Sequence, residues 1–327
     1  MTIAILSSAY SWAKFSRLKY YLFITFAHAC YISNAQALDL EMQVSNARVT
    51  LSVPENTSLL HQRKFKQWIS TSMQAVVNAY GEFPIDRVQV NIDYDRYARE
   101  PVPWATVIRD GIQGVHFYVN PSYPLKSFVN DWTAYHEFSH LLIPYPGRAS
   151  MWFSEGLASY YQNILQARAG TISAQVAMQK LYDGFVRGTK DKNTGGLSLR
   201  KLSVEMKQRR SFMRVYWAGA AYFLNVDVAL RQAGLPMQSL DDVLKEFKRC
   251  CLARDRYWSA KAIIDEFDRI SGSAIFSSEY YRVIDRTRFP AYEHSFRALG
   301  IDLENTGRIT INNRQPGSLF YQLVQGR

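Results

Sequence analysis

The chain contains 327 residues, of which 47% are hydrophobic and 20% are charged. This is the composition of an ordinary globular protein with enough apolar material for a sizeable core, and not that of a disordered chain. The formal net charge of +11 permits attraction to nucleic acid or anionic membranes, but it is equally compatible with simple solubility. There is no internal repeat, low-complexity tract or obvious linker, so one domain with two lobes is expected.

The first 37 residues have the three parts of a secretory signal peptide. The start is basic and lacks acids, residues 20–32 are mostly apolar, and Ala35-Gln36-Ala37 provides a cleavage site. The apolar run is too short to span a membrane comfortably. We predict that residues 1–37 are a signal peptide and that residues 38–327 form an exported, periplasmic protein. Secretion, a lipid anchor at Cys30 and an uncleaved anchor are the alternatives.

Cys250 and Cys251 are the cysteines that remain after this cleavage. Two adjacent cysteines cannot join distant parts of a fold, so the core must hold the protein together. We interpret the pair as small residues on a helix. A vicinal or an intermolecular disulfide is the alternative in an oxidising compartment.

The first half of the mature chain mixes strands with helices. Alternating polarity predicts strands at Ala47–Val53, Arg87–Tyr94 and Gly114–Val119. Apolar residues at helical spacing predict a helix from about residue 65 to Tyr80, which Gly81 ends. A second helix, capped by Asn130 or Asp131, is expected to run to about Ile143, before Pro144.

The second half of the chain is predicted to be mainly helical. Helices are expected at 152–168, 172–187, 213–232, 239–250 and 258–270, with one or two more in 277–300 and a short strand at 308–311. The fold class is therefore α+β. A mixed α/β lobe, 38–143, would precede a mainly helical lobe, 144–327.

The segment AYHEFSHLLIP contains His136, Glu137 and His140 in the spacing H-E-x-x-H. Residues four apart on a helix share one face, separated by a rise of about 6 Å. His136 and His140 can therefore aim both imidazoles at one Zn²⁺ ion, and Glu137 beside them can act as a general base. The alternative is a pair of histidines on a half-buried helix face beside a solvated glutamate.

Glu155 is the candidate for a third zinc ligand. It follows His140 by fifteen positions and stands in a second predicted helix, MWFSEGLASYYQNIL. A loop that begins at Pro144 could reverse the chain and bring Glu155 to the metal. Two histidines, one glutamate and an open position form a catalytic zinc set. The alternative is an ordinary acidic residue near a helix N-terminus.

Three motifs in this order resemble the gluzincin metallopeptidases and cover about residues 125–245. HEFSH and WFSEGLASYY match the two metal-binding helices, and RVYWAGAAYFLNVDVALRQ followed by SLDDVL resembles the glycyl aminopeptidase-type catalytic domain. The resemblance implies a zincin-like, thermolysin-like fold that holds one zinc ion. It also assigns Tyr216 to the hydroxyl that stabilises the oxyanion of the tetrahedral intermediate.

The chain departs from this family pattern in several respects. Ser159 stands four residues after Glu155, where relatives commonly carry an acid that supports a zinc histidine. No segment that reads a free amino terminus is evident, so the resemblance leaves open whether chain ends or interiors are cut. The strand Gly114–Val119 could pair with an extended peptide, or it could lie inside the sheet.

These observations predict an exported zinc metallopeptidase that acts on a peptide or protein substrate. We expect no nucleic-acid partner and no stable membrane span after signal cleavage. One alternative is a catalytically silent relative that serves as a periplasmic binding or scaffold protein, which the serine at position 159 favours. A further alternative is binding of nucleic acid or anionic lipid through the basic residues Lys245, Lys248, Arg249, Arg254 and Arg256.

Overall fold

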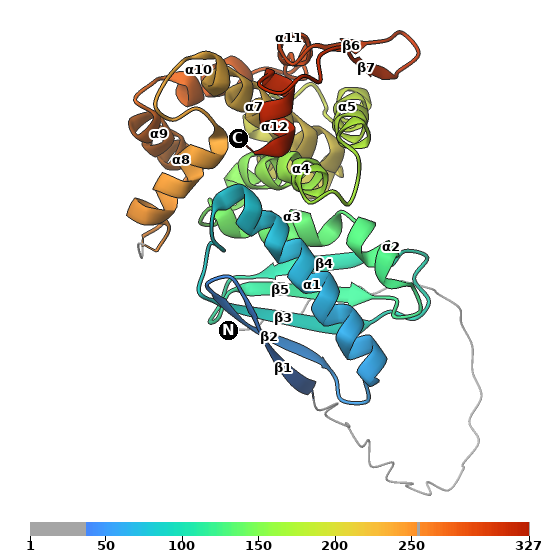
Figure 1. Cartoon of the computed structure of the whole chain (residues 1–327). Coiled ribbons are helices and arrows are strands. Elements are labelled where there is room, and N and C mark those ends of the chain that lie inside the picture. Colours follow the sequence, from blue (N-terminus) through green and yellow to red (C-terminus); the bar gives the residue numbers. More distant parts are fainter. Residues whose placement is uncertain (1–36, 254–255, 327) are drawn as a thin grey trace, which may run out of the picture. The chain divides into compact units, whose positions relative to one another are not determined.

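The computed structural model describes residues 37–253 and 256–326 (Figure 1). The predicted signal peptide therefore falls outside the described residues, apart from Ala37, which begins the first strand. Among the helices of the described residues, none is both long enough and apolar enough to cross a membrane.

A five-stranded mixed sheet forms the α/β part. Its strands are β1 (Ala37–Val44), β2 (Ala47–Pro54), β3 (Arg87–Tyr94), β4 (Trp104–Ile108) and β5 (Gly114–Val119). Their order in the sheet is β1-β2-β3-β5-β4. The β2–β3 and β3–β5 pairs are parallel, whereas β1–β2 and β4–β5 are antiparallel. The antiparallel strand β4 thus forms one edge of the sheet.

Three helices accompany this sheet, namely α1 (Leu59–Tyr80), α2 (Leu125–Asn130) and α3 (Thr133–Ser139). Ser58 caps α1 by accepting a hydrogen bond from the backbone of His61. Phe117 of β5 packs against Trp68 of α1 and Phe138 of α3, with ring centroids 4.9 and 6.0 Å apart. Both helices therefore cover the same face of the sheet, and their aromatic side chains form its core.

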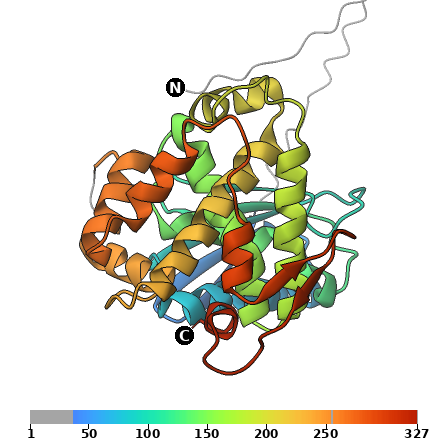
Figure 2. The same cartoon turned by 90° about the horizontal axis from the view of Figure 1, so that it is seen from above.

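The remaining chain is mainly helical, with a small hairpin near its end (Figure 2). Its elements are α4 (Met151–Arg168), α5 (Ala174–Lys190), α6 (Leu199–Arg209), α7 (Phe212–Gln232), α8 (Leu240–Phe247), α9 (Ala260–Ser271), α10 (Ile275–Val283), α11 (Glu293–Ala298), β6 (Ile301–Leu303), β7 (Ile309–Ile311) and α12 (Leu319–Gln325). Nearly every residue of α4 and most residues of α7 are buried. These two helices consequently form the centre of the helical part.

A buried polar network joins α4 to α7 and α8. Asp227 of α7 accepts hydrogen bonds from the Tyr160 hydroxyl at 2.6 Å and the Leu240 backbone at 3.0 Å. Asp241 of α8 accepts from the Tyr161 hydroxyl at 2.7 Å. The SLDD segment noted in the sequence therefore stabilises the packing of α8 against the central helices, because it satisfies polar groups that are buried there.

The structure confirms an α+β fold with a helical C-terminal part and corrects several details. The strands β1, β4 and β6 and the helices α2, α6 and α12 were not predicted. Gly114–Val119 is an internal strand, so the proposed role in peptide pairing does not fit it. The helix expected to continue to Ile143 ends at Ser139, and His140–Leu142 form a 3₁₀ turn.

The cysteine pair also differs from the interpretation given above. Cys250 and Cys251 are joined by a vicinal disulfide. They lie in a π-helical turn, Lys248–Leu252, that follows α8. The prediction of two unlinked residues on an ordinary helix was therefore wrong.

Two of the predicted basic residues are engaged in intramolecular ion pairs. Lys248 contacts Glu82 at 2.8 Å, and Arg249 contacts Glu246 at 3.3 Å. Arg256 stacks its guanidinium over the Trp258 ring, and Arg254 lies outside the described residues. Lys248, Arg249 and Arg256 therefore each have an intramolecular contact.

Candidate metal centre

The helix α3 presents the two histidines of the H-E-x-x-H segment to the helical part. The Asp131 carboxylate accepts a hydrogen bond from the Thr133 backbone at 2.8 Å and so fixes the turn that leads into the helix. At the other end, the guanidinium of Arg109 donates to the His140 carbonyl at 2.7 Å. The helix is therefore held at both ends, with His136 within it and His140 at the start of the 3₁₀ turn.

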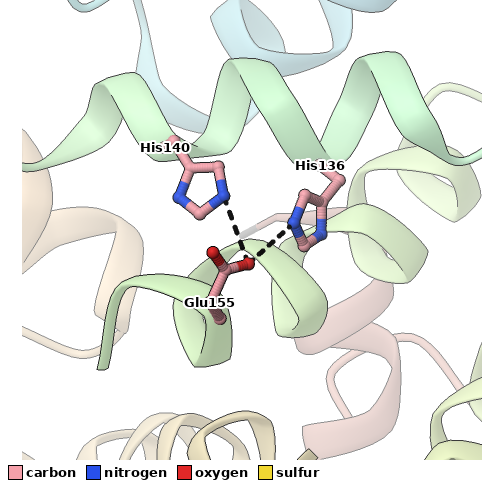
Figure 3. A group of neighbouring side chains, drawn as sticks. All are labelled: His136, His140 and Glu155. Atoms are coloured by element: carbon pink, nitrogen blue, oxygen red, sulfur yellow. Dashed lines mark hydrogen bonds and ion pairs between the residues drawn. The ribbon is translucent and has the colours of Figure 1, made fainter. Parts of the chain in front are cut away.

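Glu155 of α4 meets both histidines (Figure 3). Its Oε2 atom lies 3.2 Å from Nε2 of His136 and 3.5 Å from Nε2 of His140. The three residues are only 4%, 7% and 8% exposed for His136, His140 and Glu155. One atom from each converges on a common point, so the trio can form an H-E-x-x-H-type zinc site.

The opposite ring nitrogens of the histidines have their own partners. Nδ1 of His136 lies 2.8 Å from the Gln162 side-chain oxygen, and Nδ1 of His140 lies 3.0 Å from the Ser154 hydroxyl. When Nδ1 of each ring carries the proton and donates it to these acceptors, Nε2 is unprotonated. Its lone pair then points towards Glu155. This is the arrangement that orients histidine ligands around a metal, and the donor set therefore fits zinc.

Gln162 and Ser154 were not predicted from the sequence. The sequence analysis expected the residue that orients a zinc histidine at position 159, where this chain has a serine. In the structure, the Gln162 side chain contacts His136 instead. A helical signal exists, because positions 155, 159 and 162 share one face of α4. Choosing among the polar residues on that face requires the rotation of α4 relative to α3, which the sequence does not specify.

The charges of the cluster stabilise one another. Burial lowers the pKa of His136, but Glu155 and Glu137 more than offset this, so the pKa lies above its usual 6.5. Burial alone would raise the pKa of Glu155, yet His140 and His136 hold that pKa well below its usual range. An ionised carboxylate beside two imidazoles is a site prepared for a cation.

Glu137 and Tyr216 lie close to this trio. Burial raises the pKa of the Glu137 carboxyl, although His136 and His140 oppose the shift. The Tyr216 ring of α7 stacks on His136 with centroids 6.2 Å apart and planes 17° apart. Burial raises the pKa of its hydroxyl, and Glu155 and Glu137 raise it further. Tyr216 therefore remains a hydrogen-bond donor beside the cluster.

The structure thus brings together all five residues predicted for the site. It also shows that the edge strand β4, as well as its neighbour β5, packs beside α3. Trp104 at the start of β4 is 63% exposed, and no residue of β4 is fully buried.

The family model for M61 glycyl aminopeptidase matches residues 146–222, which include Glu155 and Tyr216. A search of curated proteins finds no match. The resemblance to zinc metallopeptidases expected from the sequence is nevertheless confirmed by the family match and by solved structures.

The similar solved structures are zinc peptidases or aminopeptidases by description. An aminopeptidase N family protein from Idiomarina loihiensis has a TM-score of 0.63 at 14% identity, covering 81% of this chain and 49% of that chain. An M1 zinc metallopeptidase mutant from Deinococcus radiodurans, bound to a Tyr-Ser-Ala substrate, has a TM-score of 0.50 at 14% identity, covering 79% and 53%. Aminopeptidase A from Legionella pneumophila, in complex with aspartic acid, has a TM-score of 0.51 at 12% identity, covering 77% and 28%.

These identities show a shared fold, a mixed α/β part with a helical part. The chain spans about half the length of the first two of these proteins and less of the third. Their reactions and ligands are therefore properties of longer proteins.

Proposed function

We propose that this chain is an exported zinc metallopeptidase, with His136, His140 and Glu155 as the ligands of one Zn²⁺ ion. The observation that carries the proposal is the convergence of these three side chains, each histidine being oriented from its far nitrogen. A structural zinc site closes its fourth position with another protein ligand. Among the described residues no fourth metal-binding side chain joins the trio, which supports a catalytic site.

The proposed reaction is hydrolysis of a peptide bond. Zinc, when bound, polarises the peptide carbonyl and makes water a better nucleophile at neutral pH. The Glu137 carboxylate takes one proton from the attacking water and later delivers it to the leaving amine nitrogen. Its position next to a metal ligand on α3 supports this role, because proton transfer requires hydrogen-bonding distance to the reacting atoms.

Tyr216 is proposed to stabilise the negative charge that develops on the carbonyl oxygen. Its hydroxyl stays protonated and faces the same cluster as Glu137 and Glu155. A donor fixed before the reaction stabilises the transition state more than the ground state. The stacking of Tyr216 on His136 provides that fixed position.

The exposed edge of the sheet is proposed to align the substrate. An unpaired strand edge accepts an extended peptide through backbone hydrogen bonds. Strand β4 is such an edge, and it lies beside α3. We therefore also propose a thermolysin-like arrangement, with the site in a cleft between the α/β and helical parts. The periplasmic location is proposed on separate grounds, namely the predicted signal peptide.

The alternative of a silent relative was favoured by Ser159. That argument is weakened because Gln162 supplies the hydrogen bond to His136. The discriminating experiment incubates the purified, zinc-loaded protein with a mixed synthetic peptide library and identifies products by mass spectrometry. We expect new peptide ends that disappear after chelation and return with zinc. A folded, zinc-loaded protein that generates no new ends contradicts the proposal, and the pattern of ends distinguishes interior from terminal cleavage.

A further inference from the structure

A cavity of about 390 Å³ adjoins the metal centre on the side of Tyr216. His136, Gln162 and Tyr216 belong to its wall, so the cavity borders the candidate zinc site on the side of one proposed ligand and the proposed oxyanion donor. Helix α5 forms another wall. A ligand in this cavity would therefore be the part of a substrate adjacent to the cleaved bond.

The α5 wall carries an unbalanced positive charge. Lys180, Asp183 and Arg187 line the cavity, and their spacing places them on one helix face. Neither Lys180 nor Arg187 forms an ion pair within the described parts of the chain. Arg187 instead lies over the Trp217 ring at 5.2 Å, and Asp183 accepts a hydrogen bond from Gln179 at 2.8 Å. Two cations thus face one aspartate that already has a donor.

A buried amide of α4, which forms another wall of the cavity, lacks a partner. Asn163 lines the cavity and is 1% exposed. Within the described residues, its Nδ2 atom has no hydrogen-bond acceptor. Buried donors are nearly always satisfied, so an acceptor from a ligand would complete this site.

We propose that this cavity binds a carboxylate of the peptide substrate, with Lys180 and Arg187 as its specificity-determining residues. Carboxylate oxygens match both the two cations and the unsatisfied amide donor. The carboxylate can belong to an acidic side chain or to the C-terminus of a short peptide. This inference rests on the proposed peptidase function, because it assigns the substrate class of that same site.

The test measures binding separately from cleavage. A Glu137→Gln variant keeps peptides intact, and its affinity for them is measured by calorimetry. Four peptides share one sequence. The two positions that flank the cleaved bond are both Glu or both Gln, and the C-terminus is either free or amidated. We expect the carboxylate that occupies the cavity to strengthen binding by about two- to fivefold, the range of partly exposed ion pairs. Comparison of Glu with Gln tests whether the bound carboxylate is a side chain. Comparison of the free with the amidated C-terminus tests whether it is the end of the peptide.

Second substitutions in this background test the residues. Lys180→Gln and Arg187→Gln should each abolish most of the preference, whereas Asp183→Asn should increase it. Lys190→Gln is the matched control, because Lys190 lies at the end of the same helix, is exposed and does not line the cavity. It should leave the preference unchanged.

Equal binding of all four peptides, or a preference that the Lys190 control reduces as much as the others do, overturns the inference. The same peptides are then given to the protein with Glu137 intact. Cleavage without a carboxylate preference contradicts this inference alone. Carboxylate-dependent binding without cleavage supports the inference and contradicts the proposed reaction.

Discussion

Gly156 of α4 and Gly219 of α7 face each other where the two buried helices cross. A methyl group on Gly156 would overlap the Gly219 backbone, and one on Gly219 would overlap the Trp152 carbonyl. Glycine permits this close approach of two backbones. Because Glu155 adjoins Gly156 and Tyr216 lies one turn before Gly219, the crossing sets the distance between the proposed ligand and the proposed oxyanion donor.

The first prediction concerns this crossing. Gly219→Ala should lower the free energy of unfolding by about 1–3 kcal/mol, since the overlapping atoms belong to backbone and cannot move aside easily. Urea denaturation measures the change. Val204→Ala, at a 64% exposed position of α6, serves as the control and should have little effect. A Gly219→Ala protein as stable as the parent would show that the helices separate freely.

A second prediction concerns the support of His136. Gln162→Leu removes the acceptor at Nδ1 and should weaken zinc binding by about 10- to 100-fold, measured by competition with a chromogenic chelator. Gln162→Glu should retain or strengthen binding, because a carboxylate raises the basicity of the ring. Ser159→Ala is the matched control on the same helix. If it weakens zinc binding more than Gln162→Leu does, the assignment of Gln162 is wrong.

The third prediction concerns the pH dependence of zinc binding. Burial lowers the pKa of His136, but the neighbouring carboxylates raise it above 6.5 overall in the metal-free protein. A proton on this ring competes with zinc, so affinity should fall by about tenfold per pH unit below that raised pKa. Glu155 contributes little there, because its pKa lies well below its usual range. Dissociation constants from pH 5.5 to 8 test this, and values independent of pH would contradict it.

A fourth prediction separates buried from exposed ion pairs. Arg168 and Asp241 pair at 2.9 Å with side chains 3% and 6% exposed. Asp241→Ala should cost about 3–5 kcal/mol of unfolding free energy, since it leaves a buried guanidinium uncompensated. Asp285→Ala breaks the exposed pair with Arg200 and should cost less than about 1 kcal/mol. Similar losses in the two variants would contradict this account of the network.

Those site residues that lie close together in the sequence could be predicted from it. The spacing of His136 and His140 defines a common helix face whatever the rest of the chain does. Glu155 required a tertiary contact, and the motif around it supplied that information. Gln162 was missed because its role depends on how α4 is rotated against α3.

The fold shows the same division. Strand β3 was predicted from clear alternation, whereas β4, with the sequence WATVI, has no such pattern. An edge strand is only partly buried, so its sequence carries a weaker signal. The Cys250–Cys251 bond was only an alternative in the sequence analysis, because adjacency of two cysteines permits a bond without requiring it, and the sequence does not mark the π-helical turn in which they lie.

The central claim is that Glu137 acts as a base beside a zinc ion held by three other residues. The most direct test compares the purified protein with its Glu137→Gln variant, measuring zinc content and peptide turnover on the same samples. We predict one zinc per chain in both proteins and turnover in the parent alone, with a decrease of at least about 10²-fold in the variant. Equal turnover by both proteins, or zinc lost from the variant only, would contradict the account.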